Sequence, residues 1–105
     1  MAADNDVIRK CKVALQKHYG CVFKGLILYG SLARNQGEAN SDIDLLVLLN
    51  SPFDYFEELR RIVDLLYPIQ LESNRLISAK PAAVDEFEKG SIQLYRNAKK
   101  EGVEV

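Results

Sequence analysis

The stretch LILYGSLARNQGEANSDIDLLVLL, residues 26–49, decides the fold of this chain. It contains two short apolar runs, and both have the length of a buried strand. The first run ends at Gly30-Ser31, and the second follows Asp42-Ile43-Asp44 without a break. The pattern therefore predicts strands over 26–29 and 42–49, a helical turn opening at 31–35 and a polar loop at 36–41.

The rest of the chain predicts helices around these strands. Apolar residues at helical spacing indicate a helix over 4–19 that ends at Gly20. A second apolar stripe, from Phe56 to Leu66, indicates a helix that starts near Asp54 and ends before Pro68. A third strand is expected at 69–78, and two short helices after Pro81, split at Lys89-Gly90, with Ser91 as a candidate N-cap. This order predicts an α/β (α+β) fold with a small mixed sheet and helices packed against it.

Composition is typical of one ordinary globular domain over residues 1–105. Apolar residues make up 48% of the chain and charged residues 28%. The formal charge is −1, from 14 basic and 15 acidic side chains, so the chain lacks the charge of a strongly basic nucleic-acid binder. The longest apolar run is too short to cross a membrane, and the N-terminus lacks signal-peptide features. We therefore expect a cytoplasmic protein with no membrane partner. Cys11, His18 and Cys21 match no standard zinc spacing.

Asp42 and Asp44 are the strongest candidates for a functional site. Side chains two positions apart on a strand point to the same face, so these carboxylates are expected to lie side by side. They repel each other, and a packed core does not compensate for that repulsion. A hard divalent cation such as Mg²⁺ does compensate, because it prefers carboxylate and phosphate oxygens.

The Gly30-Ser31 pair predicts a phosphate-binding turn. Gly30 allows the backbone to turn sharply after the strand, and N–H groups at the start of the next element favour anions. The Ser31 hydroxyl adds a donor, and Arg34 lies one turn further on, where it would meet a triphosphate. A metal pair and a phosphate turn, with no nucleophilic cysteine or Ser–His pair, indicate phosphoryl or nucleotidyl transfer.

These residues resemble a known family. Gly30-Ser31-Leu32-Ala33-Arg34 followed by Ser41-Asp42-Ile43-Asp44-Leu45 is similar to the signature of the DNA polymerase β-like nucleotidyltransferases. The ten-residue gap and the small size resemble the minimal nucleotidyltransferase (MNT) branch. The resemblance implies that Gly30 and Ser31 hold the triphosphate of ATP or another nucleoside triphosphate. Arg34 and Ser41 are also expected to bind the nucleotide. It also implies that Asp42 and Asp44 hold two Mg²⁺ ions.

The family usually has a third carboxylate on the next strand, which serves as a base or a metal ligand. Glu72 is the best match in this chain, on the polar face of the strand expected at 69–78. The family prefers aspartate at this position, and the chain has no aspartate between Asp64 and Asp85. Glu72 is therefore expected as the third catalytic and metal-binding carboxylate, with a solvated strand residue as the alternative.

The resemblance also implies a partner. Small MNT proteins often accompany a HEPN-domain toxin, which they neutralise, in some cases by transferring AMP to it. A chain this short is expected to lack a second domain for the acceptor, so a partner protein or a homo-oligomer would supply one. The alternative is a weakly active or inactive antitoxin that neutralises its partner by contact. A stand-alone enzyme for small-molecule acceptors is disfavoured on the same ground.

Overall fold

The computed structural model describes residues 4–34 and 41–105, and its strands form a sheet in the order β3-β2-β1-β4. β1 (Phe23–Tyr29) runs antiparallel to β2 (Ile43–Leu49) and to the short β4 (Val103–Glu104). β3 (Ile77–Ala83) is parallel to β2. Parallel neighbours need a crossover connection, and here helix α2 (Tyr55–Gln70) provides it. The predicted α+β class with a small mixed sheet is confirmed.

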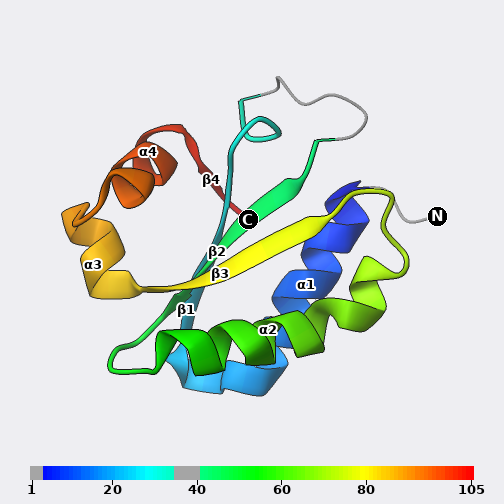
Figure 1. Ribbon diagram of the computed structural model, residues 1–105, viewed down its shortest axis with the longest axis horizontal. Coiled ribbons are helices and arrows are strands. Elements are labelled where there is room, and N and C mark those ends of the chain that lie inside the picture. The colour runs from blue at the N-terminus through cyan, green and yellow to red at the C-terminus, as the bar shows by residue number, and fades with distance from the viewer. Residues whose placement is uncertain (1–3, 35–40) are drawn as a thin grey trace.

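Helices cover both faces of this sheet (Figure 1). α1 (Asp4–Tyr19), which runs into a short 3₁₀ turn at Gly20–Val22, packs with α2 on one face. α3 (Val84–Lys89) and α4 (Gln93–Glu101) lie on the other face, beyond the end of β3. In the described part of the chain, no helix is both long enough and apolar enough to span a membrane.

The alternation of side chains along β2 separates two apolar clusters. Ile43, Leu45, Val47 and Leu49 join the larger cluster, under α1 and α2. The side chains between them point the other way, and Leu46 and Leu48 join Phe87 of α3 and Ala98 of α4 in the smaller cluster. Asp44 belongs to this second face. Its side chain is only half-buried, which indicates that the helices cover this part of the face incompletely.

The end of α2 differs from the sequence prediction. The helix continues through Pro68 to Gln70, whereas the sequence predicted an end before the proline. Ile69 explains the difference, because it packs into the larger cluster together with Ile62 and Leu66. Pro68 itself faces outward, so the ring disturbs the helix at its exposed side near the C-terminus.

The third strand also begins later than predicted. It covers Ile77–Ala83, and residues 71–76 form a turn. Gln70 holds this turn closed, because its Nε2 donates to the Arg75 carbonyl at 2.9 Å and its Oε1 accepts from the Ile77 amide at 2.7 Å. The alternation of apolar and polar residues suggested a strand over 69–78. Its first part instead belongs to the end of α2 and to the turn that follows. Pro81 fits inside β3 because β3 is an edge strand.

Smaller features divide between confirmed and corrected predictions. Asp54 caps α2 by accepting from the Glu57 amide at 2.9 Å, as its position suggested. The break between α3 and α4 falls at Gly90, with φ +66°. Ser91 is not the cap of α4, because that position is Ile92. The sequence did not predict β4. The loop expected at 36–41 lies outside the described residues except for Ser41.

Candidate active site

Gly30 lies directly against Asp44. β1 ends at Tyr29, which pairs with Asp44 across the antiparallel ladder, so the turn after β1 passes beside the start of β2. Gly30 has φ +78°, a conformation that residues with a Cβ rarely adopt. A Cβ at this position would also collide with the Asp44 carboxylate. Glycine is therefore needed here both for the turn and for the space that the carboxylate occupies.

The segment after Gly30 is a tight turn, where the sequence predicted a helical one. The Arg34 amide donates to the carbonyls of Gly30 and Ser31 at 3.3 and 3.2 Å. The Arg34 guanidinium forms an ion pair with Glu101 at the end of α4, with Nη1 and Oε2 3.1 Å apart. A hollow of about 150 Å³ separates this turn from α4, lined by Tyr29, Gly30, Arg34, Leu94, Asn97, Ala98 and Glu101.

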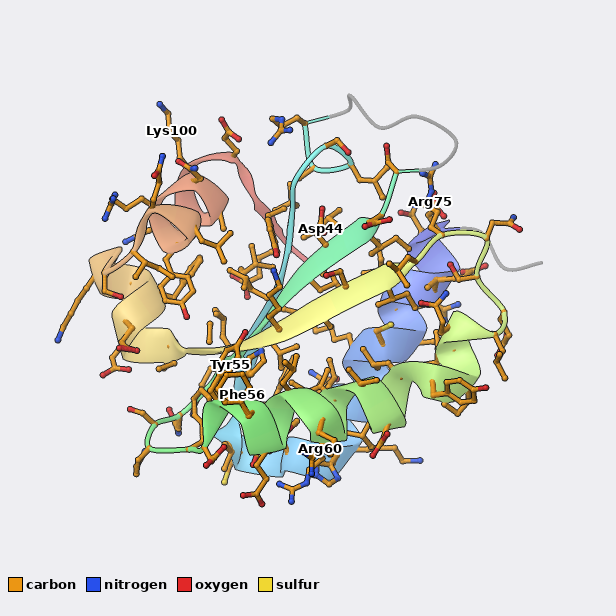
Figure 2. The ribbon with its side chains drawn as sticks, viewed as in Figure 1. Asp44, Tyr55, Phe56, Arg60, Arg75 and Lys100 are labelled. Atoms are coloured by element: carbon orange, nitrogen blue, oxygen red, sulfur yellow. The ribbon has the colours of Figure 1, made fainter. Side chains whose placement is uncertain are left out.

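Asp42 and Asp44 lie close together at the start of β2 (Figure 2 labels Asp44). Asp42 is exposed and immediately precedes the strand, while Asp44 is the second strand residue and half-buried. Burial raises the pKa of Asp44, the neighbouring Asp42 charge raises it further, and the Lys80 ammonium partly opposes both effects. A carboxylate in this position is stabilised by added positive charge, so the pair fits a hard divalent cation.

Glu72 does not lie on the strand beside this pair. It follows α2 in the turn that leads to β3, and its carboxylate is 2.7 Å from the Lys10 ammonium of α1. Among the described residues, no three Asp, Glu, His or Cys side chains are grouped so that they could hold a metal ion together. The placement of Glu72 on the third strand is therefore wrong, because that placement depended on reading the end of α2 as strand.

Arg75 is a residue at the site's edge that sequence reasoning missed. Its Nη1 donates to the Ser41 carbonyl at 2.9 Å, and its Nε donates to Asp4 of α1 at 2.9 Å. Figure 2 shows Arg75 near the start of β3, on the side where β2 begins. Arg75 thus fixes the backbone just before Asp42. No local pattern marks it, since its partners lie 34 and 71 positions away in sequence.

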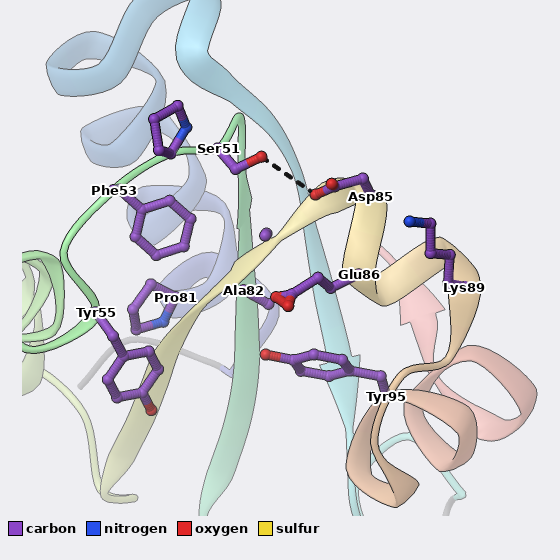
Figure 3. A pocket seen from close by; sticks show the side chains of 11 residues that line it. Ser51, Phe53, Tyr55, Pro81, Ala82, Asp85, Glu86, Lys89 and Tyr95 are labelled. Carbon is purple, nitrogen blue, oxygen red and sulfur yellow. Dashed lines mark hydrogen bonds between the residues drawn. The ribbon is translucent and has the colours of Figure 1, made fainter.

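A larger cavity of about 450 Å³ opens near the other end of β3 (Figure 3). Its walls carry the aromatic rings of Phe53, Tyr55 and Tyr95 and the carboxylates of Asp85 and Glu86. Burial, the Asp44 carboxylate and then Tyr55 raise the pKa of Tyr29 to about 12. Lys89 also lines the cavity, so two carboxylates face one ammonium group. This excess of negative charge disfavours a triphosphate here, and the Gly30-Ser31 turn is better suited to phosphate.

A phosphate-type turn after one strand, beside paired aspartates at the start of the next, defines a nucleotidyl-transferring class of protein. The comparison with protein families agrees. The chain belongs to the nucleotidyltransferase domain family, whose model matches residues 8–104. The predicted resemblance to minimal nucleotidyltransferases is confirmed.

Two relatives come from Methanocaldococcus jannaschii. One, named "Putative protein adenylyltransferase MJ0604", is 30% identical over 100 residues, which cover 94% of each chain. The other, "Putative protein adenylyltransferase MJ0126", is 36% identical over 87 residues, 83% of this chain and 76% of that protein. A solved structure described as a toxin–antitoxin with AMP-PNP matches with a TM-score of 0.55 at 18% identity, over 97% of this chain and 72% of that one. At that identity the match shows a shared fold.

Proposed function

We propose that this chain transfers AMP from ATP to a hydroxyl group on a partner protein. The observation that carries the proposal is the contact between Gly30 and Asp44, which joins a phosphate-type turn to an aspartate pair. The names of the two archaeal relatives support protein adenylylation as the particular reaction. The fold match to a structure solved with AMP-PNP supports ATP as the donor.

The roles within the site follow from chemistry. Asp42 and Asp44 would hold Mg²⁺, and Gly30, Ser31 and Ser41 would bind the phosphates through backbone and hydroxyl groups. Arg34, the last residue of the turn, would turn its guanidinium from Glu101 toward the leaving pyrophosphate. When bound, the metal would neutralise charge on the phosphate oxygens and align the reacting groups. Glu72 has no part in this proposal, because Lys10 holds its carboxylate in the turn after α2.

The transfer is a single displacement at the α-phosphorus of ATP. The acceptor oxygen forms a new bond to this phosphorus, and the bond between the α-phosphorus and the pyrophosphate oxygen breaks. Pyrophosphate leaves with the bonding electron pair, and the hydroxyl proton goes to solvent. The residues of this chain position the triphosphate for that attack.

The partner in this proposal is a HEPN-type toxin, and the chain acts as its antitoxin in the cytoplasm. The toxin–antitoxin description of the matched structure supports this assignment. The exposed side chains of Phe56, Val63 and Tyr67 also support a protein partner. They lie 7 and 4 positions apart and so follow one face of α2 (Phe56 is labelled in Figure 2). A second copy of this chain is the other candidate for that surface.

Neutralisation by contact alone is the second candidate function, and two observations favour it. β3 carries no acidic residue at all, since its sequence is ISAKPAA. The exposed side chains of Phe56, Val63 and Tyr67 lie on the opposite side of the sheet from Asp44. This follows because α2 packs against the face of β2 that carries Ile43 and Leu45. A protein bound to these exposed side chains would reach the Asp44 side only around the edge of β3.

Transfer of label separates the two functions. The chain is incubated with a HEPN-domain partner, Mg²⁺ and ATP labelled at the α-phosphate, and pyrophosphate release is followed in parallel. The proposal expects label on the partner and one pyrophosphate per label, with both lost in the Asp42→Asn/Asp44→Asn variant. Neutralisation of the partner by this variant, or by wild type without any label transfer, would instead establish the contact function.

A further inference from the structure

β3 places Ser78 and Lys80 on the same face of the sheet as Asp44. The register pairs Asp44 with Ser78 and Leu46 with Lys80 in the parallel ladder. Paired residues on neighbouring strands point to the same face, so Ser78 is the direct neighbour of Asp44 and Lys80 is its diagonal neighbour. The position beside the metal-binding aspartate therefore carries a hydroxyl, and the next inward position carries an ammonium group.

Lys80 is half-buried on this face, and the register makes it the diagonal neighbour of the Asp44 carboxylate. Within residues 4–34 and 41–105, Lys80 forms no hydrogen bond or ion pair with a side chain. A half-buried ammonium that is near a carboxylate yet unpaired has its donors available for another anion.

The charges of this face favour one divalent ion over two. Asp42 and Asp44 are two acidic residues, and Lys80 brings one positive charge to the same face. A site for two ions of this kind uses a further carboxylate to bind the second ion, because each ion needs several oxygen ligands. Ser78 offers only one neutral hydroxyl at that position, and the nearby ammonium repels a second cation.

We propose that the site holds a single divalent ion between Asp42 and Asp44, and that Lys80 binds the triphosphate in place of a second ion. This inference rests on the proposed function for the identity of the nucleotide. Lys80 is thereby a phosphate-binding residue, and its ammonium donates to a phosphate oxygen from the β3 side of the site. The Gly30-Ser31 turn holds the same triphosphate from the β1 side.

The first test counts ions. Mn²⁺ replaces Mg²⁺, and electron paramagnetic resonance measures bound Mn²⁺ per chain in the presence of saturating AMP-PNP. The proposal expects one ion per nucleotide-bound wild-type chain and two in the Ser78→Asp/Lys80→Met variant, which supplies a carboxylate and removes the ammonium. Two ions in wild type, or no bound Mn²⁺ and AMP-PNP at all, would overturn the proposal.

The second test measures affinity. Lys80→Met should weaken AMP-PNP binding about 10- to 100-fold, the effect of one lost hydrogen bond to a charged group. Lys80→Arg should recover most of the affinity, and adenosine, which has no phosphates, should bind wild type and Lys80→Met alike. Lys24→Met is the matched control, because Lys24 is exposed at the end of β1 that lies away from Asp44. Unchanged AMP-PNP affinity in Lys80→Met would contradict the assignment. Both readouts are binding measurements, so failure of AMP transfer alone refutes the proposed function and leaves this inference standing.

Discussion

Residues alternate along β2 between two faces of the sheet, and the two faces have different environments. One face is buried in the core, and the other carries the candidate site. On one face, Ile43, Leu45, Val47 and Leu49 are at most 1% exposed and lie under α1 and α2. On the other face, Asp44 is half-buried, next to the Gly30 turn. The apolar face stabilises the sheet, and the mixed face carries two carboxylates that cost stability without a cation. Changes on the two faces should therefore affect folding and nucleotide binding separately.

The largest effect on folding is expected from the apolar face. Leu45→Ala removes a side chain with 0% exposure, which should lower the free energy of unfolding by about 2–5 kcal/mol. Urea denaturation measures this loss. Leu71→Ala is the control, since Leu71 is exposed and its truncation should change stability by less than about 0.5 kcal/mol. Equal losses in the two variants would contradict the assignment of Leu45 to the core.

The next prediction compares two glycine substitutions, one that strains the backbone and also disrupts the site and one that only strains the backbone. Gly30→Ala should cost about 1–2 kcal/mol for its positive φ and should also displace Asp44, so Mg²⁺-ATP binding is lost. Gly20→Ala has a similar φ of +58° but nothing within 4 Å of the added Cβ. It should show the strain alone and keep the nucleotide. Isothermal titration calorimetry with AMP-PNP and Mg²⁺ distinguishes them, and retained binding in Gly30→Ala would refute the contact.

A smaller effect concerns the pH dependence of the metal-free protein. The Asp44 pKa is raised in the folded state, so the folded chain binds protons more tightly than the unfolded chain. Stability should therefore fall as the pH rises from the ordinary value of 3.8 through the raised pKa. Asp44→Asn should lack this fall and melt at a higher temperature than wild type at neutral pH. Melting curves of both proteins, recorded without metal between about pH 3.5 and pH 7, check these outcomes. Identical pH profiles for wild type and Asp44→Asn would contradict them.

The smallest effect is expected at Glu72. Its ion pair with Lys10 joins two half-exposed side chains, and such pairs contribute about 0–1 kcal/mol. Glu72→Gln should leave the affinity for Mg²⁺-ATP and the rate of AMP transfer within twofold of wild type, by analogy with neutral surface changes of less than about 0.5 kcal/mol. A loss of transfer with retained binding would restore Glu72 as the base.

The sequence alone predicts the region in which the secondary-structure pattern and the candidate site residues occupy the same short segment. The two strands, the turn at Gly30 and the aspartates at 42 and 44 lie within 24 consecutive residues, and each has its own local signature. The fold class followed from the order of these elements and the helices around them.

The position of β3 could not be predicted in the same way. Pro68 suggested the end of a helix and Pro81 suggested the start of one, but burial of Ile69 carries α2 past the first proline. Pro81 is tolerated within β3 because β3 is at the edge of the sheet, where the missing N–H group does not break a strand pairing. Both effects depend on tertiary neighbours that a local pattern does not contain. The neighbours of Asp44 on β3 were missed for the same reason, because only the register assigns Ser78 and Lys80 to that face.

The most direct test of the central claim is the effect of Mg²⁺-ATP on the melting temperature. The claim is that Asp42 and Asp44, together with the Gly30-Ser31 turn, bind metal and nucleotide as one site. ATP with Mg²⁺ at 100 times its Kd should stabilise wild type by about 2.7 kcal/mol and raise its Tm. The Asp42→Asn/Asp44→Asn variant should stay folded, melt no lower than wild type without ligand, and show no shift. A variant that keeps the wild-type shift, or a wild type that shows none, would contradict the account.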